Sequence, residues 1–176
     1  MKSTRILFLL FLVFTFGLAA GIAIAAKALD PGTYRGKSKQ DAGSALTALA
    51  RQQAGKGSWE NIAVGRVLYL SGNKGQGQAI FDAMLARKRE GSDRMRVGRV
   101  YWEAKEWEKA KAMFTQALEL EPKDAPWLAE IGAYYNLMGE RAKAEELFER
   151  SFQRDSSEVW QTVNVAGSYL GVEPLR

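Results

Sequence analysis

Cysteine and histidine are both absent from the 176 residues, and their absence excludes several kinds of chemistry. Without histidine, the chain cannot form a Ser-His-Asp triad or use an imidazole as a general base. Without either residue type, it has no thiol nucleophile and none of the usual ligands of a structural zinc ion. An exported form would also fold without a disulfide, so its stability would depend on packing alone.

Sequence motifs for catalysis are also scarce. The glycine-rich segment 72–77 lacks the Gly-Lys-Ser/Thr ending of a phosphate-binding loop and follows no buried strand, so we interpret it as a turn between helices. Glu103, Glu106 and Glu108 lie close together in the sequence, and a solvated surface explains them better than an acid–base pair. The sequence therefore predicts a protein that is not an enzyme and that holds no cofactor or metal.

Charge is unevenly distributed along the chain. The formal net charge of +5 is a small basic excess and gives no reason to expect nucleic acid as a partner. Residues 27–99 carry 14 Lys/Arg and 6 Asp/Glu, a net charge of +8, whereas residues 100–176 carry 9 and 14, a net charge of −5. The basic part would suit anionic lipid heads, an acidic partner or the acidic part of a second copy.

The N-terminal segment has the pattern of a targeting sequence. Lys2 and Arg5 precede an uncharged apolar run over residues 6–26 that ends in small residues, which is typical of a signal peptide. The run is also long enough to span a bilayer, so residues 1–26 are interpreted as a cleaved signal or as an N-terminal membrane anchor. Both interpretations place the rest of the chain outside the cytoplasm, in a bacterial periplasm or facing it from the inner membrane. Residues 27–43 are predicted to form a linker.

Two 34-residue segments, 91–124 and 125–158, repeat the same pattern. In both, an apolar-Gly pair, a tyrosine, an alanine and a phenylalanine stand at identical offsets; Ser151 and Ser156 depart from the alanine and proline of the first. The matching residues are Val97-Gly98, Tyr101, Ala110, Phe114, Ala117 and Pro122, and then Ile131-Gly132, Tyr135, Ala144 and Phe148. A weaker copy occupies 58–90, and 159–171 supplies a first helix alone, which we expect to cap the domain of residues 44–176.

This pattern resembles the tetratricopeptide repeat. The resemblance implies an all-α fold, an α-solenoid in which antiparallel helix pairs stack in a right-handed superhelix. Gly98 and Gly132 would let the partner helix approach closely, with Ala110 and Ala144 doing the same from the other side. The aromatic residues beside them are expected to be core and nothing else: Tyr101, Tyr135, Phe81, Phe114, Phe148 and Tyr169. Asp124 is expected to cap a helix, and Gly139 and Lys105-Glu106 to form turns.

In the family that the pattern resembles, the inner, concave face of the first helices receives a peptide. The matching positions predict a peptide-binding surface, because Arg grips carboxylates and Trp and Tyr offer large, stiff contact areas. Arg99 and Asn136 loosely resemble a clamp for a peptide's terminal carboxylate. The alternative is that the tryptophans pack against neighbouring helices and the arginines are solvated. The predicted peptide-binding residues are Trp59, Arg66, Tyr69, Arg96, Arg99, Trp102, Glu130, Asn136 and Asn164. The same face is expected to include Ile62, Met95, Ala129, Ala133, Trp160 and Val163 beside them.

These observations predict a non-enzymatic adaptor or scaffold that binds a protein or peptide outside the cytoplasm, for example during assembly of the bacterial envelope. Residues 6–26 offer contact with a membrane. The alternative is a self-assembling structural subunit, in which copies associate through exposed edges or oppositely charged ends.

Overall fold

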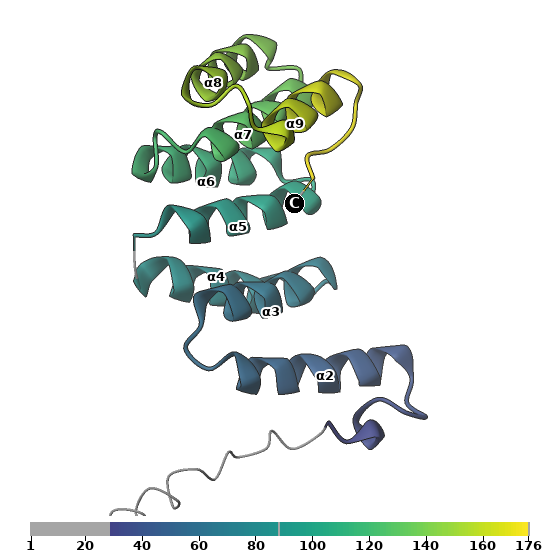
Figure 1. The fold of residues 1–176 in the computed structure, drawn as a ribbon. Helices are drawn as coiled ribbons and strands as arrows, with labels where there is room; N and C mark the ends of the chain where they lie inside the picture. Colours follow the sequence, from purple (N-terminus) through teal and green to yellow (C-terminus); the bar gives the residue numbers. More distant parts are fainter. Residues whose placement is uncertain (1–28, 88, 176) are drawn as a thin grey trace, which may run out of the picture. The chain divides into compact units, whose positions relative to one another are not determined.

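A computed structural model describes residues 29–87 and 89–175. Within these residues the chain forms one short 3-10 helix, η1, and eight α-helices, α2 to α9, without a strand (Figure 1). By its internal contacts the chain divides into two compact units, of which one ends at Ala45 and the other begins at Leu46. Each unit is described by itself.

In the first unit, part of the predicted linker is helical. η1 covers Pro31–Thr33, and the Asp30 side chain caps it by accepting a hydrogen bond of 3.0 Å from the Gly32 amide. α2 covers Lys39–Ala54, so it begins within residues 27–43. The Ser38 hydroxyl accepts a hydrogen bond from the Asp41 amide at its start, which is the capping interaction that favours a helix there. The expectation of a linker throughout residues 27–43 is therefore wrong for Lys39–Gly43.

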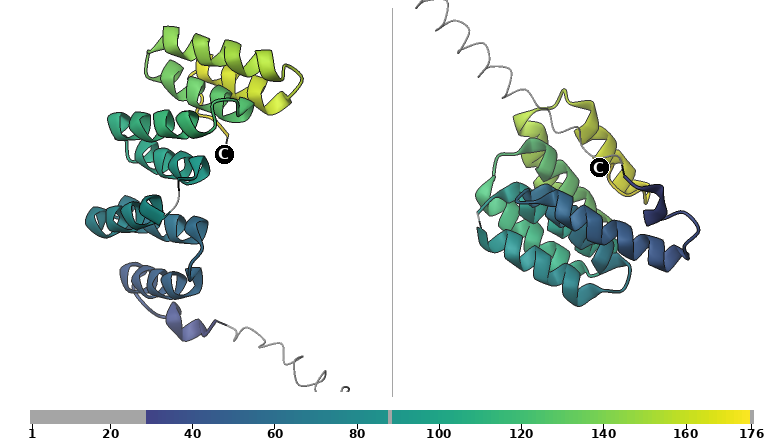
Figure 2. Two further views of the ribbon diagram at one scale, coloured as in Figure 1. Left: turned by 90° about the vertical axis from the view of Figure 1, so that its left-hand side faces the viewer. Right: turned by 90° about the horizontal axis from the view of Figure 1, so that it is seen from below.

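The second unit contains the rest of α2, three helix pairs and a final single helix (Figures 1 and 2). Short turns reverse the chain within each pair. The helices begin at Ser58, Gly91, Ala125 and Val159, the residues at which the predicted repeats begin. The pairs are α3 (Ser58–Leu70) with α4 (Lys74–Arg87), α5 (Gly91–Glu103) with α6 (Trp107–Leu120), and α7 (Ala125–Leu137) with α8 (Arg141–Arg154); α9 covers Val159–Tyr169.

Within each pair, a phenylalanine ring lies directly on a glycine of the first helix. A Cβ atom added at Gly98 would lie 2.6 Å from the Phe114 ring, and one added at Gly132 would lie 2.6 Å from the Phe148 ring. Gly65 has the same relation to Phe81. Real Cβ atoms do not approach other atoms so closely, so these positions need glycine for the helices to nest.

The predicted turns and cap are present. Gly139 has a φ of +81°, and Lys105, which lies 34 residues earlier, has a φ of +61°. Lys105, although not a glycine, therefore adopts the left-handed conformation that Gly139 adopts at the equivalent position of the next repeat. The side chain of Asp124 accepts a hydrogen bond of 2.9 Å from the Trp127 amide, and Pro126 lies in the first turn of α7.

Five of the six aromatic residues expected in the core are buried, together with Ala110 and Ala144. Tyr169 is the exception, with 47% of its surface exposed, so its assignment to the core is wrong. The reason is that the first helices α3, α5 and α7 each pack against a second helix, whereas α9 has no such partner among the described residues.

The final helix also differs from the polar cover that a helical stack needs at its end. α9 leaves several large apolar side chains exposed, so it does not close the stack with a polar surface. These are Val159, Trp160, Val163 and Tyr169.

No helix in the described part of the chain combines the length and the apolar character needed to cross a bilayer. The predicted signal or anchor, residues 1–26, lies outside the described residues.

Candidate functional site: the first-helix face

The nine residues predicted to bind a peptide all lie on α3, α5, α7 and α9, the first helices of the repeats. We call the surface that these helices form the first-helix face. The structure places its residues in three groups: one cation–π pair with an exposed indole, a series of polar contacts between neighbouring first helices, and side chains that are buried.

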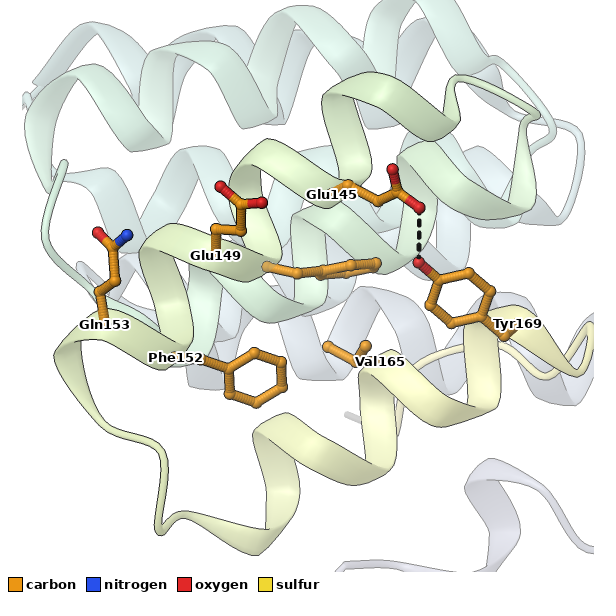
Figure 3. Close-up of a pocket in the computed structure, with 7 residues that line it drawn as sticks. Glu145, Glu149, Phe152, Gln153, Val165 and Tyr169 are labelled. Carbon is orange, nitrogen blue, oxygen red and sulfur yellow. Dashed lines mark hydrogen bonds between the residues drawn. The ribbon is translucent and has the colours of Figure 1, made fainter.

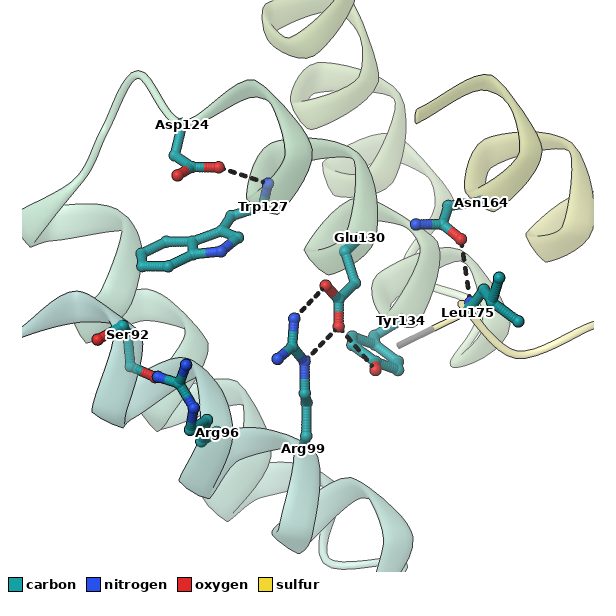
Figure 4. Close-up of polar contacts among 9 residues, drawn as sticks. All are labelled: Ser92, Arg96, Arg99, Asp124, Trp127, Glu130, Tyr134, Asn164 and Leu175. Atoms are coloured by element: carbon teal, nitrogen blue, oxygen red, sulfur yellow. Dashed lines mark hydrogen bonds and ion pairs between the residues drawn. The ribbon is translucent and has the colours of Figure 1, made fainter. Parts of the chain in front are cut away.

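Trp59 and Arg96 form the cation–π pair. The guanidinium carbon of Arg96, on α5, lies 3.4 Å from the centre of the Trp59 ring on α3, which is a cation–π contact. Arg96 Nη1 donates to the carbonyl oxygen of Ser92 (Figure 4). Partial burial lowers the pKa of Arg96, and the nearby Asp93 carboxylate opposes this, so Arg96 stays charged at neutral pH. Trp59 remains 58% exposed and offers its indole to solvent.

Arg99 is held within the chain. Its guanidinium makes two hydrogen bonds to the Glu130 carboxylate of α7, and the Tyr134 hydroxyl donates to the same carboxylate at 3.1 Å (Figure 4). Burial opposes the charge of Arg99, but the hydrogen bond and the charge of Glu130 outweigh it and raise the pKa of Arg99. Burial and the Glu130 charge raise the pKa of Tyr134 as well. This cluster joins α5 to α7.

Similar contacts join the other first helices. Arg66 on α3 forms an ion pair of 2.6 Å with Glu103 on α5. Asn136 on α7 donates to the Ser168 hydroxyl on α9 at 3.0 Å. Asn164 on α9 accepts from the amide of Leu175, which ties the segment after α9 to the same face (Figure 4).

The remaining predicted residues are buried, and so are four residues expected beside them on this face, Ile62, Met95, Ala129 and Ala133. Tyr69 donates its hydroxyl to Glu106 at 2.7 Å, and Trp102 packs against Trp107 and Tyr134, with its indole nitrogen buried without a hydrogen-bond partner. Glu130 is buried in the cluster described above. Tyr69, Trp102 and Glu130 therefore have almost no surface left for a ligand, and their assignment as exposed peptide contacts is wrong, because contacts between repeats use them.

The suggested carboxylate clamp is not supported either, because other residues of the chain already bind its side chains. A clamp needs Arg99 and Asn136 to direct unpaired donors at a ligand, but Glu130 occupies the guanidinium of Arg99 and Ser168 accepts from the amide of Asn136. The exposed residues of the first-helix face are Trp59 and Arg66 on α3 and Trp160 with Val163 on α9. The half-buried Arg96 of α5 is stacked on Trp59. Trp59 and Trp160 are each the second residue of their helix, and each is 58% exposed.

Carboxylates that we expected to be solvated hold the repeats together. Glu106 accepts hydrogen bonds from Tyr69 and Lys74 of the preceding repeat and from Lys109. Burial opposes its ionisation, but the hydrogen bonds from Lys109, Lys74 and Tyr69 outweigh burial and lower its pKa to about 2.

Glu140 lies 34 residues after Glu106 and has the same role. It accepts from the Trp107 indole at 2.8 Å and from Lys111 at 2.7 Å. The recurrence of glutamate at the same place in two repeats is the sequence signal that could have identified both residues.

The described residues contain no group of three or more acidic side chains arranged to hold a metal ion. The first-helix face combines exposed aromatic rings, a charged guanidinium and a series of internal ion pairs. Such an arrangement can bind another macromolecule through rigid aromatic contacts.

Comparison with known proteins agrees with this geometry. Residues 94–124, which include most of α5 and all of α6, match the family model described as Tetratricopeptide repeat. A crystal structure of MamA is similar in fold, with a TM-score of 0.52 and 16% sequence identity over 75% of this chain and 77% of that chain. No curated protein matches the sequence. The predicted all-α solenoid of helix pairs is thereby confirmed.

Proposed function

We propose that this chain is a non-enzymatic scaffold that binds a protein or peptide partner through the accessible part of its first-helix face. The observation that carries the proposal is the exposed Trp59 ring, fixed by the Arg96 guanidinium stacked on it at 3.4 Å. A large aromatic side chain that is held in one position loses little entropy on binding, which is why such residues contribute strongly to interfaces. The tetratricopeptide match supports a role in protein binding.

The partner is met outside the cytoplasm. The basic start and the apolar run of residues 6–26 support export to a bacterial periplasm or anchoring in the inner membrane with the repeats facing it. Cell fractionation followed by N-terminal sequencing tests this part. A mature protein that begins after residue 26 indicates a cleaved signal, an intact N-terminus in the membrane fraction indicates an anchor, and an intact protein in the cytosol overturns the assignment.

Site-specific photocrosslinking tests the binding surface. A crosslinking amino acid is placed at Ala63, which is exposed on α3 four residues after Trp59, and, as a control, at Ala112, which is exposed on α6, a second helix. The expected result is a discrete crosslinked protein from position 63 that is absent from position 112. Arg96→Glu in the same background should reduce the yield, because it removes the cation that fixes this part of the surface. Equal products from the two positions would overturn the assignment to the first-helix face.

Self-assembly is the second candidate, and the uneven charge of the sequence favours it. Residues 27–99 have a net charge of +8 and residues 100–176 one of −5, so copies would attract one another through unlike parts. Sedimentation velocity at low and high salt separates the two candidates. Self-assembly predicts larger species that dissociate as salt rises, whereas a monomer at every concentration removes this candidate.

A further inference from the structure

A groove of about 560 Å³ runs between α8 and α9, and none of the residues predicted to bind a peptide lines it. Its apolar floor includes Phe152, Val165 and Tyr169, and its charged lining consists of two carboxylates, Glu145 and Glu149 (Figure 3). Glu145 accepts from the Tyr169 hydroxyl and pairs with Arg141. Glu149 is exposed and forms no salt bridge within the described residues.

A corresponding groove exists one repeat earlier, and there α8 of the same chain supplies part of its lining. Moving back by 34 residues takes Phe152 to Leu118, Val165 to Ile131 and Tyr169 to Tyr135. These earlier residues line a smaller groove of about 230 Å³ together with three side chains of α8. Tyr135 is 5% exposed there, whereas Tyr169 is 47% exposed. The three side chains of α8 are Lys143, Leu147 and Arg150.

These three residues of α8 indicate which side chains would suit the groove between α8 and α9. Lys143, Leu147 and Arg150 stand at i, i+4 and i+7, so one face of a helix places a leucine between two cations. The later groove favours cations more strongly, because two carboxylates, Glu145 and Glu149, line it, whereas Glu119 is the one carboxylate that lines the earlier groove. An incoming helix would meet a small side chain on α9 as well, since the exposed Ala166 takes the place of Gly132.

We propose that the groove between α8 and α9 is a docking site for an amphipathic helix of a protein partner. This helix presents a leucine-sized apolar side chain with a lysine or arginine four residues before it and another three residues after it. It completes the last repeat as α8 completes the one before. The proposal concerns a surface other than the Trp59–Arg96 pair, so it stands or fails independently of the proposed function.

A second copy of this chain is a poorer occupant. Among the helices of residues 29–87 and 89–175, α8 alone has the required spacing of cation, apolar residue and cation. Leu147 is completely buried in its own repeat, so a folded copy cannot offer this face. The observations therefore favour a different protein as the source of the helix.

A helix-stabilised peptide with the sequence of α8, residues 141–154, is the probe. Lysine in place of Ala142 allows a lactam bridge to Glu146; both positions are exposed in α8, and the bridge removes most of the entropic cost of ordering a short helix. Fluorescence anisotropy of the labelled peptide against the full chain measures binding. We expect saturable binding that weakens about tenfold with Glu149→Lys, because this replacement puts a cation where the groove meets cations.

Two controls make the result specific. Glu108→Lys introduces the same charge change on the exposed face of α6, away from the groove, and should leave the affinity unchanged. A peptide with Leu147→Glu should not bind, because its central apolar contact is gone. Arg96→Glu should also leave peptide binding unchanged, which distinguishes a failure at the groove from a failure at the first-helix face.

Several outcomes would overturn the proposal. They are the absence of saturable binding, equal affinity for the chain and its Glu149→Lys variant, and equal binding of the Leu147→Glu peptide. A concentration-dependent dimer that the peptide dissociates in sedimentation velocity would assign the groove to a second copy instead.

Discussion

Arg99 on α5 and Glu130 on α7 are joined by two short hydrogen bonds, 2.7 Å from Nε to Oε1 and 2.6 Å from Nη2 to Oε2. The pair links two successive repeats and lies mostly out of solvent, with Glu130 almost fully buried. Such bidentate pairs are strong when intact, and costly when one member is removed, because the other charge is then left without a partner. Residues that resemble a ligand clamp thus hold the repeats together.

The first prediction follows from this pair. Arg99→Leu leaves the Glu130 carboxylate buried with only the Tyr134 hydroxyl, so we expect the free energy of unfolding to fall by about 2–4 kcal/mol. Arg66→Leu is the matched control, because Arg66 pairs with Glu103 at the surface; we expect a loss below about 1 kcal/mol. Urea denaturation measures both. Similar losses for the two variants would mean that the Arg99–Glu130 pair contributes no more than a surface ion pair.

The second prediction concerns the nested helices. In Gly132→Ala, the new methyl group would lie 2.6 Å from the Phe148 ring and 3.2 Å from the Ala144 carbonyl oxygen. We expect a loss of about 1–3 kcal/mol, since the two helices must move apart. Gly75→Ala is the control: this glycine is also helical, but nothing beyond its chain neighbours and its own helix backbone lies within 4 Å of an added Cβ, so stability should stay level or rise by up to about 1 kcal/mol. Thermal melts of both variants decide whether close approach, rather than helix propensity, requires glycine at position 132.

The repeat could be predicted from the sequence because its packing depends on residue size at fixed offsets. A glycine and a phenylalanine that pack together, such as Gly98 and Phe114, recur at the same offset in each repeat, and the first helices begin where that period predicts. Lys105 could be placed in a turn for the same reason, since it lies one period before Gly139.

The functional surface could not be predicted equally well, because exposure depends on which side chains meet between repeats. An arginine or a tryptophan looks the same in the sequence whether it faces a ligand or a neighbouring helix. Trp59 is exposed and Trp102 is buried, although both lie on first helices. The difference arises from Tyr134 and Trp107, which enclose Trp102 from two other helices.

The third prediction is a pH dependence that arises from Glu106. Its pKa is about 2 in the folded chain against 4.5 for an ordinary glutamate, so the folded state holds the proton less tightly than the unfolded state does. The resulting stability is fully present above pH 4.5 and is lost as the pH falls from 4.5 through about 2. Glu106→Gln should cost about 1–2 kcal/mol at pH 7, and the difference from the unchanged chain should shrink across that interval.

Urea denaturation at several pH values between 7 and 2 measures this dependence. Glu108→Gln, at an exposed position two residues away, should show no comparable difference at any pH. A constant gap between the Glu106→Gln variant and the unchanged chain over the whole range would show that the carboxylate charge does not stabilise the fold.

The fourth prediction concerns two departures from the repeat. Ser151 stands where the preceding repeat has Ala117, and its hydroxyl lies 2.7 Å from the Ala125 carbonyl oxygen and in contact with the buried side-chain amide of Gln161. Ser151→Ala leaves that buried amide without this hydrogen-bond partner, so we expect the free energy of unfolding to fall by about 1–3 kcal/mol.

Combining Ser151→Ala with Gln161→Leu removes both polar groups and should bring the free energy of unfolding back to within about 1 kcal/mol of the unchanged chain. Ser156→Ala, at the other departure from the repeat, is exposed and should change stability little. Urea denaturation of all three variants checks the argument. If the double variant is less stable than Ser151→Ala alone, the serine and the glutamine do not depend on each other, and the two positions diverged from the repeat for separate reasons.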